Sequence, residues 1–174
     1  MFERHAYPVK RAIYFANCEA THRGADGITP EDILLGLAWD AETRADRIAH
    51  LKDNAVQLRA DLSTLHRPIT VLPYDQKKHL LLTKESIRIV NDALAEATTD
   101  KEFYADTDHL LRAFLRENNV ASAAVAKLGL TLDSLRSLSR EDRVNNPSEQ
   151  APWFWKSPLL ISKASGEPPL FYSF

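Results

Sequence analysis

The sequence contains, at residues 29–37, the stretch Thr29-Pro30-Glu31-Asp32-Ile33-Leu34-Leu35-Gly36-Leu37. A second stretch, at residues 107–115, reads Thr107-Asp108-His109-Leu110-Leu111-Arg112-Ala113-Phe114-Leu115. Each combines a hydroxyl residue that can cap a helix, acidic residues that suit the positive end of the helix dipole, and an apolar stripe. The apolar positions of the two stretches lie 77 residues apart. The pattern therefore predicts a duplicated helical domain.

Further apolar patterns with helical spacing accompany each stretch. One follows Pro8, and others begin near Thr43 and Asn54. A second series begins at Thr83, a good helix cap. We expect eight helices in two groups of four, which is an all-α fold. The expected boundaries are residues 1–65 for the first repeat, 66–82 for a connector and 83–142 for the second repeat, all within a domain of residues 1–142.

The register between the two first helices looks different from that of the later helices. Ile13 matches Ile87 at an offset of 74, whereas the later helices match at 77. This interpretation predicts three extra residues in the loop at residues 98–106.

Residues 143–174 differ in composition from the helical part. Five of the nine prolines and six of the fifteen aromatic residues fall in this segment, which we call the C-terminal arm. Prolines argue against helix, and the aromatic content argues against a freely solvated tail. We expect an extended, non-helical arm in which Trp153, Phe154 and Trp155 either form an interface or pack over the groove between the repeats.

Composition and charge exclude several classes of protein. The net charge of −2 and the pI of about 6.3 give no general attraction to nucleic acid or to anionic membranes. No window approaches the roughly 18 continuous apolar residues that would span a bilayer, and the N-terminus has no apolar run of the signal-peptide type. We expect a cytoplasmic protein with no nucleic-acid or membrane partner.

The sequence offers no recognisable catalytic, cofactor or metal site. The six histidines form no His-Glu-x-x-His pattern, and no Gly-x-Ser-x-Gly nucleophile turn occurs. Cys18, the single cysteine, is expected to be a half-buried structural thiol. His109 follows Asp108 in a first helical turn, where we expect a surface hydrogen bond. These observations predict a protein that is not an enzyme and binds no cofactor or metal.

Several stretches together resemble the Clp N-terminal (Clp R) repeat domain family. They are Met1-Phe2-Glu3-Arg4, Ala12-Ile13, residues 28–37, Leu82-Thr83-Lys84 and residues 107–111. The resemblance covers about residues 1–140 and implies a pseudo-two-fold pair of four-helix repeats. In that family the domain stands at the front of Clp unfoldases, where it docks substrates and adaptor proteins. This sequence has no Gly-x-x-x-x-Gly-Lys-Ser/Thr phosphate loop, so it resembles a stand-alone Clp N-domain, similar in layout to the accessory Clp subunits of plastids.

Some members of that family bind phosphoarginine at two related pockets, each with a threonine at a first-helix start and a glutamate at a second-helix start. By this resemblance, Glu31, Thr83 and Asp108 are candidates for a peptide or phosphoarginine-type site. Ala6-Tyr7 stand where the first threonine would be, and Asp108 is shorter than the expected glutamate. Compensation of the helix dipole also explains both acidic residues without any ligand.

The function that the resemblance implies is protein binding without chemistry, in an accessory or adaptor-type factor of Clp-dependent protein quality control. The expected partner is a Clp ATPase or protease, an adaptor or a client segment. The alternative is a small ligand-binding sensor or enzyme that has reused the repeat fold, which an enclosed pocket with converging polar groups would favour. A homodimer formed through the C-terminal arm is a third hypothesis.

Overall fold

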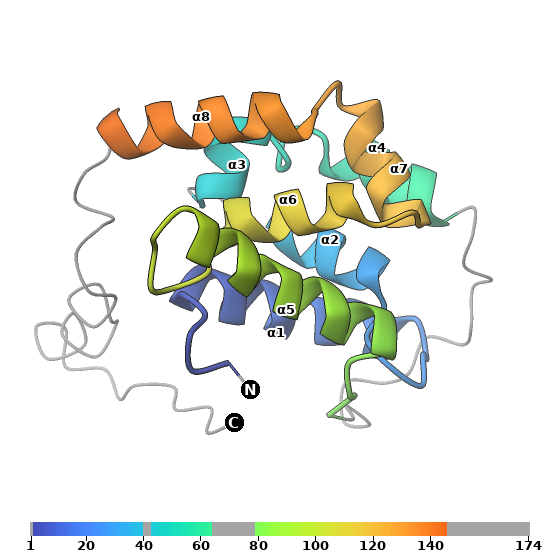
Figure 1. Cartoon of the computed structure of the whole chain (residues 1–174). Coiled ribbons are helices and arrows are strands. Elements are labelled where there is room, and N and C mark those ends of the chain that lie inside the picture. Colours follow the sequence, from blue (N-terminus) through green and yellow to red (C-terminus); the bar gives the residue numbers. More distant parts are fainter. Residues whose placement is uncertain (1, 40–42, 64–78, 146–174) are drawn as a thin grey trace, which may run out of the picture.

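Figure 1 shows a computed structural model in which the placement of residues 2–39, 43–63 and 79–145 is described. These residues form helices and connecting turns without a strand, which confirms the all-α fold. The helices are α1 (Tyr7–His22), α2 (Pro30–Trp39), α3 (Arg44–Ala49), α4 (Ala55–Ser63), α5 (Lys84–Thr99), α6 (Thr107–Arg116), α7 (Val120–Lys127) and α8 (Leu132–Asn145).

Short polar residues start most of these helices by accepting bonds from backbone N–H groups that lack an intrahelical partner. The Thr43 hydroxyl accepts from Asp46 N at the start of α3, and the Thr83 hydroxyl accepts from Ser86 N at the start of α5. The start of α1 has no such bond, because its cap is Ala6. The residues before α1 and α5 therefore share an extended backbone, but only α5 has a side-chain cap.

The cap of α6 is Asp106 rather than the hydroxyl of Thr107 that the sequence pattern suggested. The Asp106 side chain and the His109 ring form a reciprocal capping box, in which Asp106 N donates to His109 Nδ1 at 3.0 Å. The Thr107 hydroxyl is buried instead and accepts from Ala45 N of α3 at 2.9 Å. The prediction of a Thr107 cap was wrong because the Thr107 hydroxyl forms a hydrogen bond to the other repeat instead.

The two repeats match at a single offset of 77 along α1, α2 and their counterparts. Helices α1 and α5 begin at Tyr7 and Lys84 and end at His22 and Thr99, so both ends keep this offset. The offset of 74 predicted for the first helices, and the three extra loop residues with it, are wrong. The apolar spacing misled because a helix brings positions three and four apart onto one face.

Two backbone bridges show the pseudo-two-fold relation between the repeats. A parallel bridge joins His5 to Ala105, and a second joins Ile28 to Leu82. Adding 77 to His5 gives Leu82, and subtracting 77 from Ala105 gives Ile28. Helix contacts follow the same exchange, since α2 lies against α5 and α6 lies against α1. The arrangement is the pseudo-two-fold pair that the resemblance implied.

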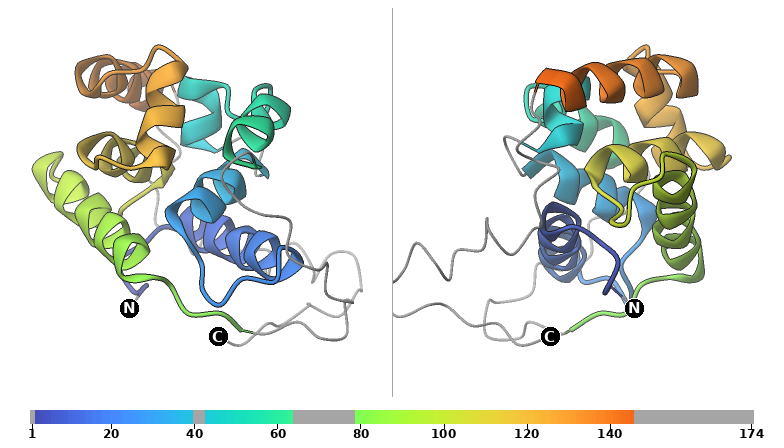
Figure 2. Two further views of the ribbon diagram at one scale, coloured as in Figure 1. Left: turned by 90° about the vertical axis from the view of Figure 1, so that its right-hand side faces the viewer. Right: turned by 60° about the vertical axis from the view of Figure 1, so that its left-hand side comes forward.

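Figures 1 and 2 show α1 and α5 at one end of the helical body, with α2 and α6 beside them and α3, α4, α7 and α8 beyond. The core lies between these layers and contains the fully buried Ile33, Leu34, Leu110 and Phe114. α1 and α2 approach closely at Gly36, where an added Cβ would lie 2.2 Å from the Ala12 carbonyl oxygen. Glycine is needed here because backbone occupies the space of a side chain.

The C-terminal end of the body differs slightly from the predicted boundary. α8 continues to Asn145, three residues past the expected end of the helical domain at residue 142. Ion pairs from Asp142 to Arg47 and from Arg143 to Asp100 hold this last turn in place. The remainder of the arm, and the connector from residue 64 to residue 78, lie outside the described residues.

Candidate functional site

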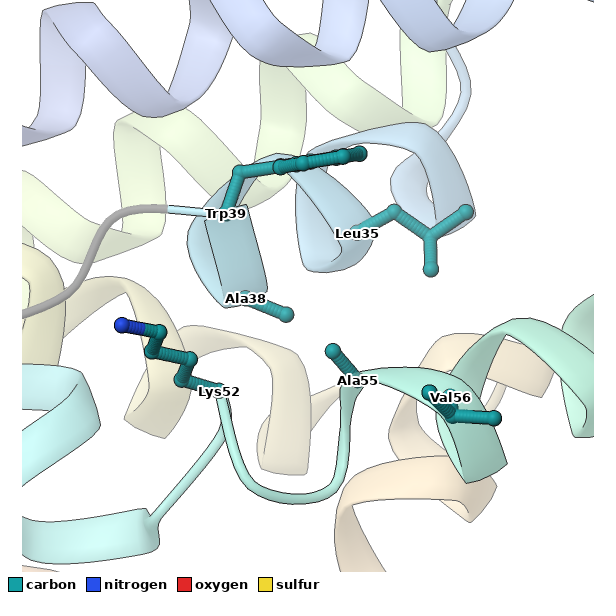
Figure 3. Close-up of a pocket in the computed structure, with 6 residues that line it drawn as sticks. All are labelled: Leu35, Ala38, Trp39, Lys52, Ala55 and Val56. Atoms are coloured by element: carbon teal, nitrogen blue, oxygen red, sulfur yellow. The ribbon is translucent and has the colours of Figure 1, made fainter.

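An open apolar groove lies between α2 and the start of α4, in the first repeat. Its lining residues are Leu35, Ala38, Trp39, Lys52, Ala55 and Val56, and it encloses about 280 Å³. Figure 3 shows the α2 side chains on one side and the α4 side chains, with Lys52, on the other. Five of the six are apolar, so the groove offers area for hydrophobic contact rather than groups for chemistry.

Trp39 is the largest side chain of this groove and the one whose orientation is best fixed. It is 56% exposed, at the last residue of α2. Its indole Nε1 donates a 2.7 Å hydrogen bond to Glu19 Oε1 of α1, and its ring stacks on Phe15 with centroids 6.5 Å apart. A large ring that is held in place but half exposed is typical of a binding surface, since little side-chain entropy is lost when a partner covers it.

The equivalent face of the second repeat holds charged residues. At the offset of 77, Arg112 stands for Leu35 and Arg116 stands for Trp39. Glu96, which stands for Glu19, pairs with both arginines as well as with Arg136. The Arg112 side chain is only 1% exposed and also contacts Asp100 Oδ2 at 2.6 Å. Ion pairs occupy the volume that is open in the first repeat.

Asp108 lies at the centre of this charged network and is fully buried. Its carboxylate contacts Arg44 Nη1 at 3.2 Å, Arg143 Nη2 at 3.3 Å and Arg112 Nη2 at 3.5 Å. Burial alone would raise the pKa of Asp108, but the charges of His109 and Arg44 hold it well below its usual range. The carboxylate is therefore ionised and paired, and it joins α3, α6 and α8.

His109 is also fully buried, so the predicted surface hydrogen bond was wrong. Burial tends to lower its pKa, but the Asp108 charge and the contact with Asp100 outweigh that effect and raise the pKa to about 9. Nδ1 lies 3.0 Å from Asp106 N and 3.2 Å from Asp108 Oδ1. A neutral ring favours the first contact and a charged ring favours the second.

The three residues that the resemblance offered as a peptide or phosphoarginine-type site do not form one site. Asp108 has no surface that a ligand can reach. Thr83 and Glu31 begin α5 and α2 next to one backbone bridge, where Thr83 N donates to Ile28 O at 3.0 Å. The Thr83 hydroxyl takes part in the helix cap. A site of this kind stays a prediction for Glu31 and Thr83, which come from different repeats.

The other predicted site residues, Trp153, Phe154 and Trp155, lie outside the described residues. Sequence reasoning missed the groove around Trp39, although one signal was available. At the offset of 77, Leu35 and Trp39 correspond to Arg112 and Arg116. A change from apolar to charged residues at equivalent positions of one helical face indicates that the two repeats use that face differently.

Two features are absent from the described residues. No group of three or more His, Cys, Asp or Glu side chains is arranged to hold a metal ion in residues 2–39, 43–63 and 79–145. Within the same residues, none of the helices is both long and apolar enough to cross a membrane. Cys18 is half-buried, as predicted.

Comparison with known proteins identifies the fold. Residues 81–152 match the family described as the Clp repeat (R) N-terminal domain. The N-terminal domain of the caseinolytic protease associated chaperone ClpD from Arabidopsis thaliana is similar, with 19% identity and a TM-score of 0.62 over 81% of this chain and 95% of that one. The Hsp104 N-terminal domain from Candida albicans is 16% identical, with a TM-score of 0.59 over 81% and 92% of the two chains.

A third similar structure comes from work on the ATPase ClpV, the TssB-TssC sheath and the accessory HsiE protein of type VI secretion. It is 18% identical, with a TM-score of 0.59 over 82% of this chain and 88% of that one. At these identities the likeness establishes a shared fold.

Proposed function

Because residues 81–152 belong to the Clp repeat (R) N-terminal domain family and the helical body shares that fold, we propose that the protein is a non-enzymatic protein-binding module. It binds apolar segments of other proteins in the groove of the first repeat. The observation that carries this proposal is the half-exposed Trp39, which Glu19 and Phe15 hold in place above an apolar floor.

The composition of the groove favours binding over chemistry. Lys52 is the one charged side chain among the described residues that line it, and Leu35, Ala38 and Ala55 supply its floor. Catalysis needs polar groups that converge on a reacting atom, and a small-ligand sensor needs several placed hydrogen-bonding groups. An open apolar surface with one cation at its rim instead suits a peptide with apolar side chains and a nearby acidic one.

Binding is expected at one repeat only. The equivalent surface of the second repeat is occupied by Arg112, Arg116 and Glu96, and Arg112 is buried. Opening that surface would separate buried charges, which is strongly unfavourable. Of these two equivalent faces, as far as the described residues show, only that of the first repeat is therefore open to a partner.

Within this function we assign the protein to Clp-dependent protein quality control in the cytoplasm, as an accessory or adaptor-type factor. Its partner is a client segment, an adaptor or a Clp ATPase or protease. The support is the family and fold, including the likeness to a structure from work on the ATPase ClpV.

The binding proposal is tested with an unfolded protein as the probe, fluorescein-labelled and carboxymethylated α-lactalbumin, followed by fluorescence anisotropy. Val56→Asp places a charge in the groove, and Val144→Asp places the same charge on an equally exposed valine of α8. Loss of one apolar contact and burial of a charge should weaken binding about tenfold in Val56→Asp. Val144→Asp should bind like the unmodified protein. Equal binding by both variants, or none by the unmodified protein, would contradict the proposal.

The Clp assignment needs its own experiment. The full chain and the Val56→Asp variant are each immobilised and incubated with a lysate of the source cells, and bound proteins are identified by mass spectrometry. Enrichment of a Clp ATPase, protease or adaptor on the unmodified chain over the variant supports the assignment. Absence of every Clp component from both samples would refute it, while leaving the binding of unfolded protein intact.

A further inference from the structure

We infer that the groove of the first repeat binds the aromatic segment Trp153-Phe154-Trp155 of the same chain, so that an outside partner must displace it. This inference rests on the proposed function of the groove and names its resident occupant. It would make the C-terminal arm an internal competitor, which sets the affinity of the module for other proteins.

The groove has the exposed apolar area that such a segment requires. Val56 is 84% exposed and Trp39 is 56% exposed, and the two lie on opposite sides of the groove in Figure 3. Large exposed apolar surfaces mark interaction sites. At about 280 Å³, the volume suits one or two large side chains rather than a folded domain.

The described end of α8 lies against α3, the helix that leads to this groove. Arg47 of α3 pairs with Asp142 near the end of α8, at 2.8 Å between Arg47 Nε and Asp142 Oδ1. The turn after α3 then folds back, since Lys52 N donates to Asp46 Oδ1 at 2.7 Å. Lys52, a lining residue of the groove, is thus linked through α3 to the last turn of α8.

The length of chain beyond α8 fits this path. Trp153 lies eight positions after Asn145, and an extended chain of that length spans about 26–29 Å. Prolines at positions 147, 152 and 158 fix φ in the range of extended backbone and disfavour helix at the residue before each. The segment is therefore long enough to reach past α3 and is biased toward the conformation that spans most distance.

The chemistry of the segment also matches the groove. Three consecutive aromatic residues supply much apolar area with few rotatable bonds, which limits the entropy lost on binding. Glu149, four residues before Trp153, is opposite in sign to Lys52 at the rim. A segment of the same chain also acts at an effective concentration near millimolar, so even weak contacts favour it over a second molecule.

The test uses Trp39 as a reporter in the full chain. One variant carries Trp153→Tyr and Trp155→Tyr, which keeps the segment aromatic while leaving Trp39 as the only remaining reporter of the three tryptophans. A second variant carries Trp153→Ser, Phe154→Ser and Trp155→Ser. Acrylamide should quench Trp39 about twofold more strongly in the serine variant, because half of an exposed ring is no longer covered. Equal quenching constants in the two variants would overturn the inference.

A second readout separates binding in cis from exchange between molecules. Both variants and the unmodified chain are examined by light scattering and by quenching at low and at high protein concentration. Binding within one chain predicts a monomer mass and a quenching difference that does not depend on concentration. A dimer mass, together with protection that appears only at high concentration, would replace the inference with an arm-exchanged homodimer.

The labelled α-lactalbumin probe distinguishes failure of this inference from failure of the proposed function. With the arm as competitor, the serine variant should bind the probe about tenfold more tightly than the unmodified chain. If both bind with the same affinity and Val56→Asp still weakens binding, the groove functions but the arm does not occupy it. If no chain binds the probe, the proposed function itself fails.

Discussion

On one face of α2 the side chains of Leu35 and Trp39 are apolar and partly open to solvent, whereas α6 carries Arg112 and Arg116 at the equivalent positions. Glu19 and Glu96 occupy matching places on α1 and α5, but one accepts a hydrogen bond from an indole and the other pairs with arginines. The same backbone thus holds a binding surface in one repeat and a closed ionic network in the other.

The difference shows how a duplicated fold divides stability and binding between its halves. Buried ion pairs fix the relative position of α3, α6 and α8, and they do so at sites where a partner cannot enter. Their removal is unfavourable because the remaining charges stay buried. The described residues that line the groove of the first repeat form no such network, so its apolar area is available to a partner.

The largest effect is expected from giving the second repeat the residue of the first, with Arg112→Leu. The change leaves Glu96, Asp100 and Asp108 short of a buried cation, so the free energy of unfolding should fall by about 3–5 kcal/mol. Urea unfolding measures it. Arg116→Leu is the matched control and should change the free energy by less than about 1 kcal/mol, since that side chain is 47% exposed. Similar values for both variants would remove the distinction between the two repeats.

A somewhat smaller effect is expected where the helix pairs α1–α2 and α5–α6 differ in packing. Gly36→Ala puts a Cβ 2.2 Å from the Ala12 carbonyl oxygen and should destabilise the protein by about 2–3 kcal/mol in urea unfolding. The equivalent position of the second repeat is already Ala113. Ala113→Gly should therefore cost only about 1 kcal/mol, from helix propensity and a lost methyl group. A harmless Gly36→Ala would mean that the two helix pairs approach equally closely.

The ionic network should also make stability depend on pH through His109. Its pKa is about 9 in the folded protein, against about 6.5 when unfolded, so folding favours the charged ring. The resulting stability is fully present below pH 6.5 and is lost as the pH rises through 9. We expect the free energy of unfolding to fall by about 2 kcal/mol between pH 6 and pH 8.5.

His109→Gln provides the control for this pH dependence, since the difference between the two proteins removes the contributions of other titrating groups. The decline should be absent from the variant. If the unmodified protein and the variant follow parallel curves, His109 is neutral at all of these pH values and Nδ1 simply accepts the hydrogen bond from Asp106 N.

The smallest effect concerns the two first helices, which share an offset but not a cap. Thr83→Ala removes the bond to Ser86 N and should cost about 1 kcal/mol. Ala6→Ser supplies a hydroxyl at the uncapped start of α1 and should stabilise the protein by about 0.5 kcal/mol. Thermal unfolding of the two variants should therefore shift in opposite directions. A destabilising Ala6→Ser would show that the His5–Ala105 bridge beside it leaves no room for a cap.

Much of the fold could be predicted from the sequence, because helix starts and apolar spacing are local properties. The caps at Thr43 and Thr83 and the apolar stripe of α2 needed no tertiary information. The register of the first helices required tertiary information, since Ile13 can be matched to Ile87 or to Val90 on spacing alone. The ends of α1 and α5, which both lie 77 residues apart, show that Ile13 matches Val90.

The candidate site was less predictable, for a physical reason. An acidic residue in a first helical turn has the same local signature whether it faces solvent or the interior. Asp108 is buried because Arg44, from a helix 64 residues away in the sequence, reaches it. His109 is buried as well, and its ring contacts the carboxylates of Asp100 and Asp108.

The helices, the duplication and the family resemblance can all be recognised in the sequence alone, since each depends on residue types at fixed spacings. Tertiary structure alone decided which of two equivalent helix faces stays open. That choice depends on whether charges distant in sequence meet and neutralise one another, as Arg112 and Glu96 do, or whether a ring such as Trp39 is left at a surface. Pairing across such distances is a property of the folded chain and carries no local signal.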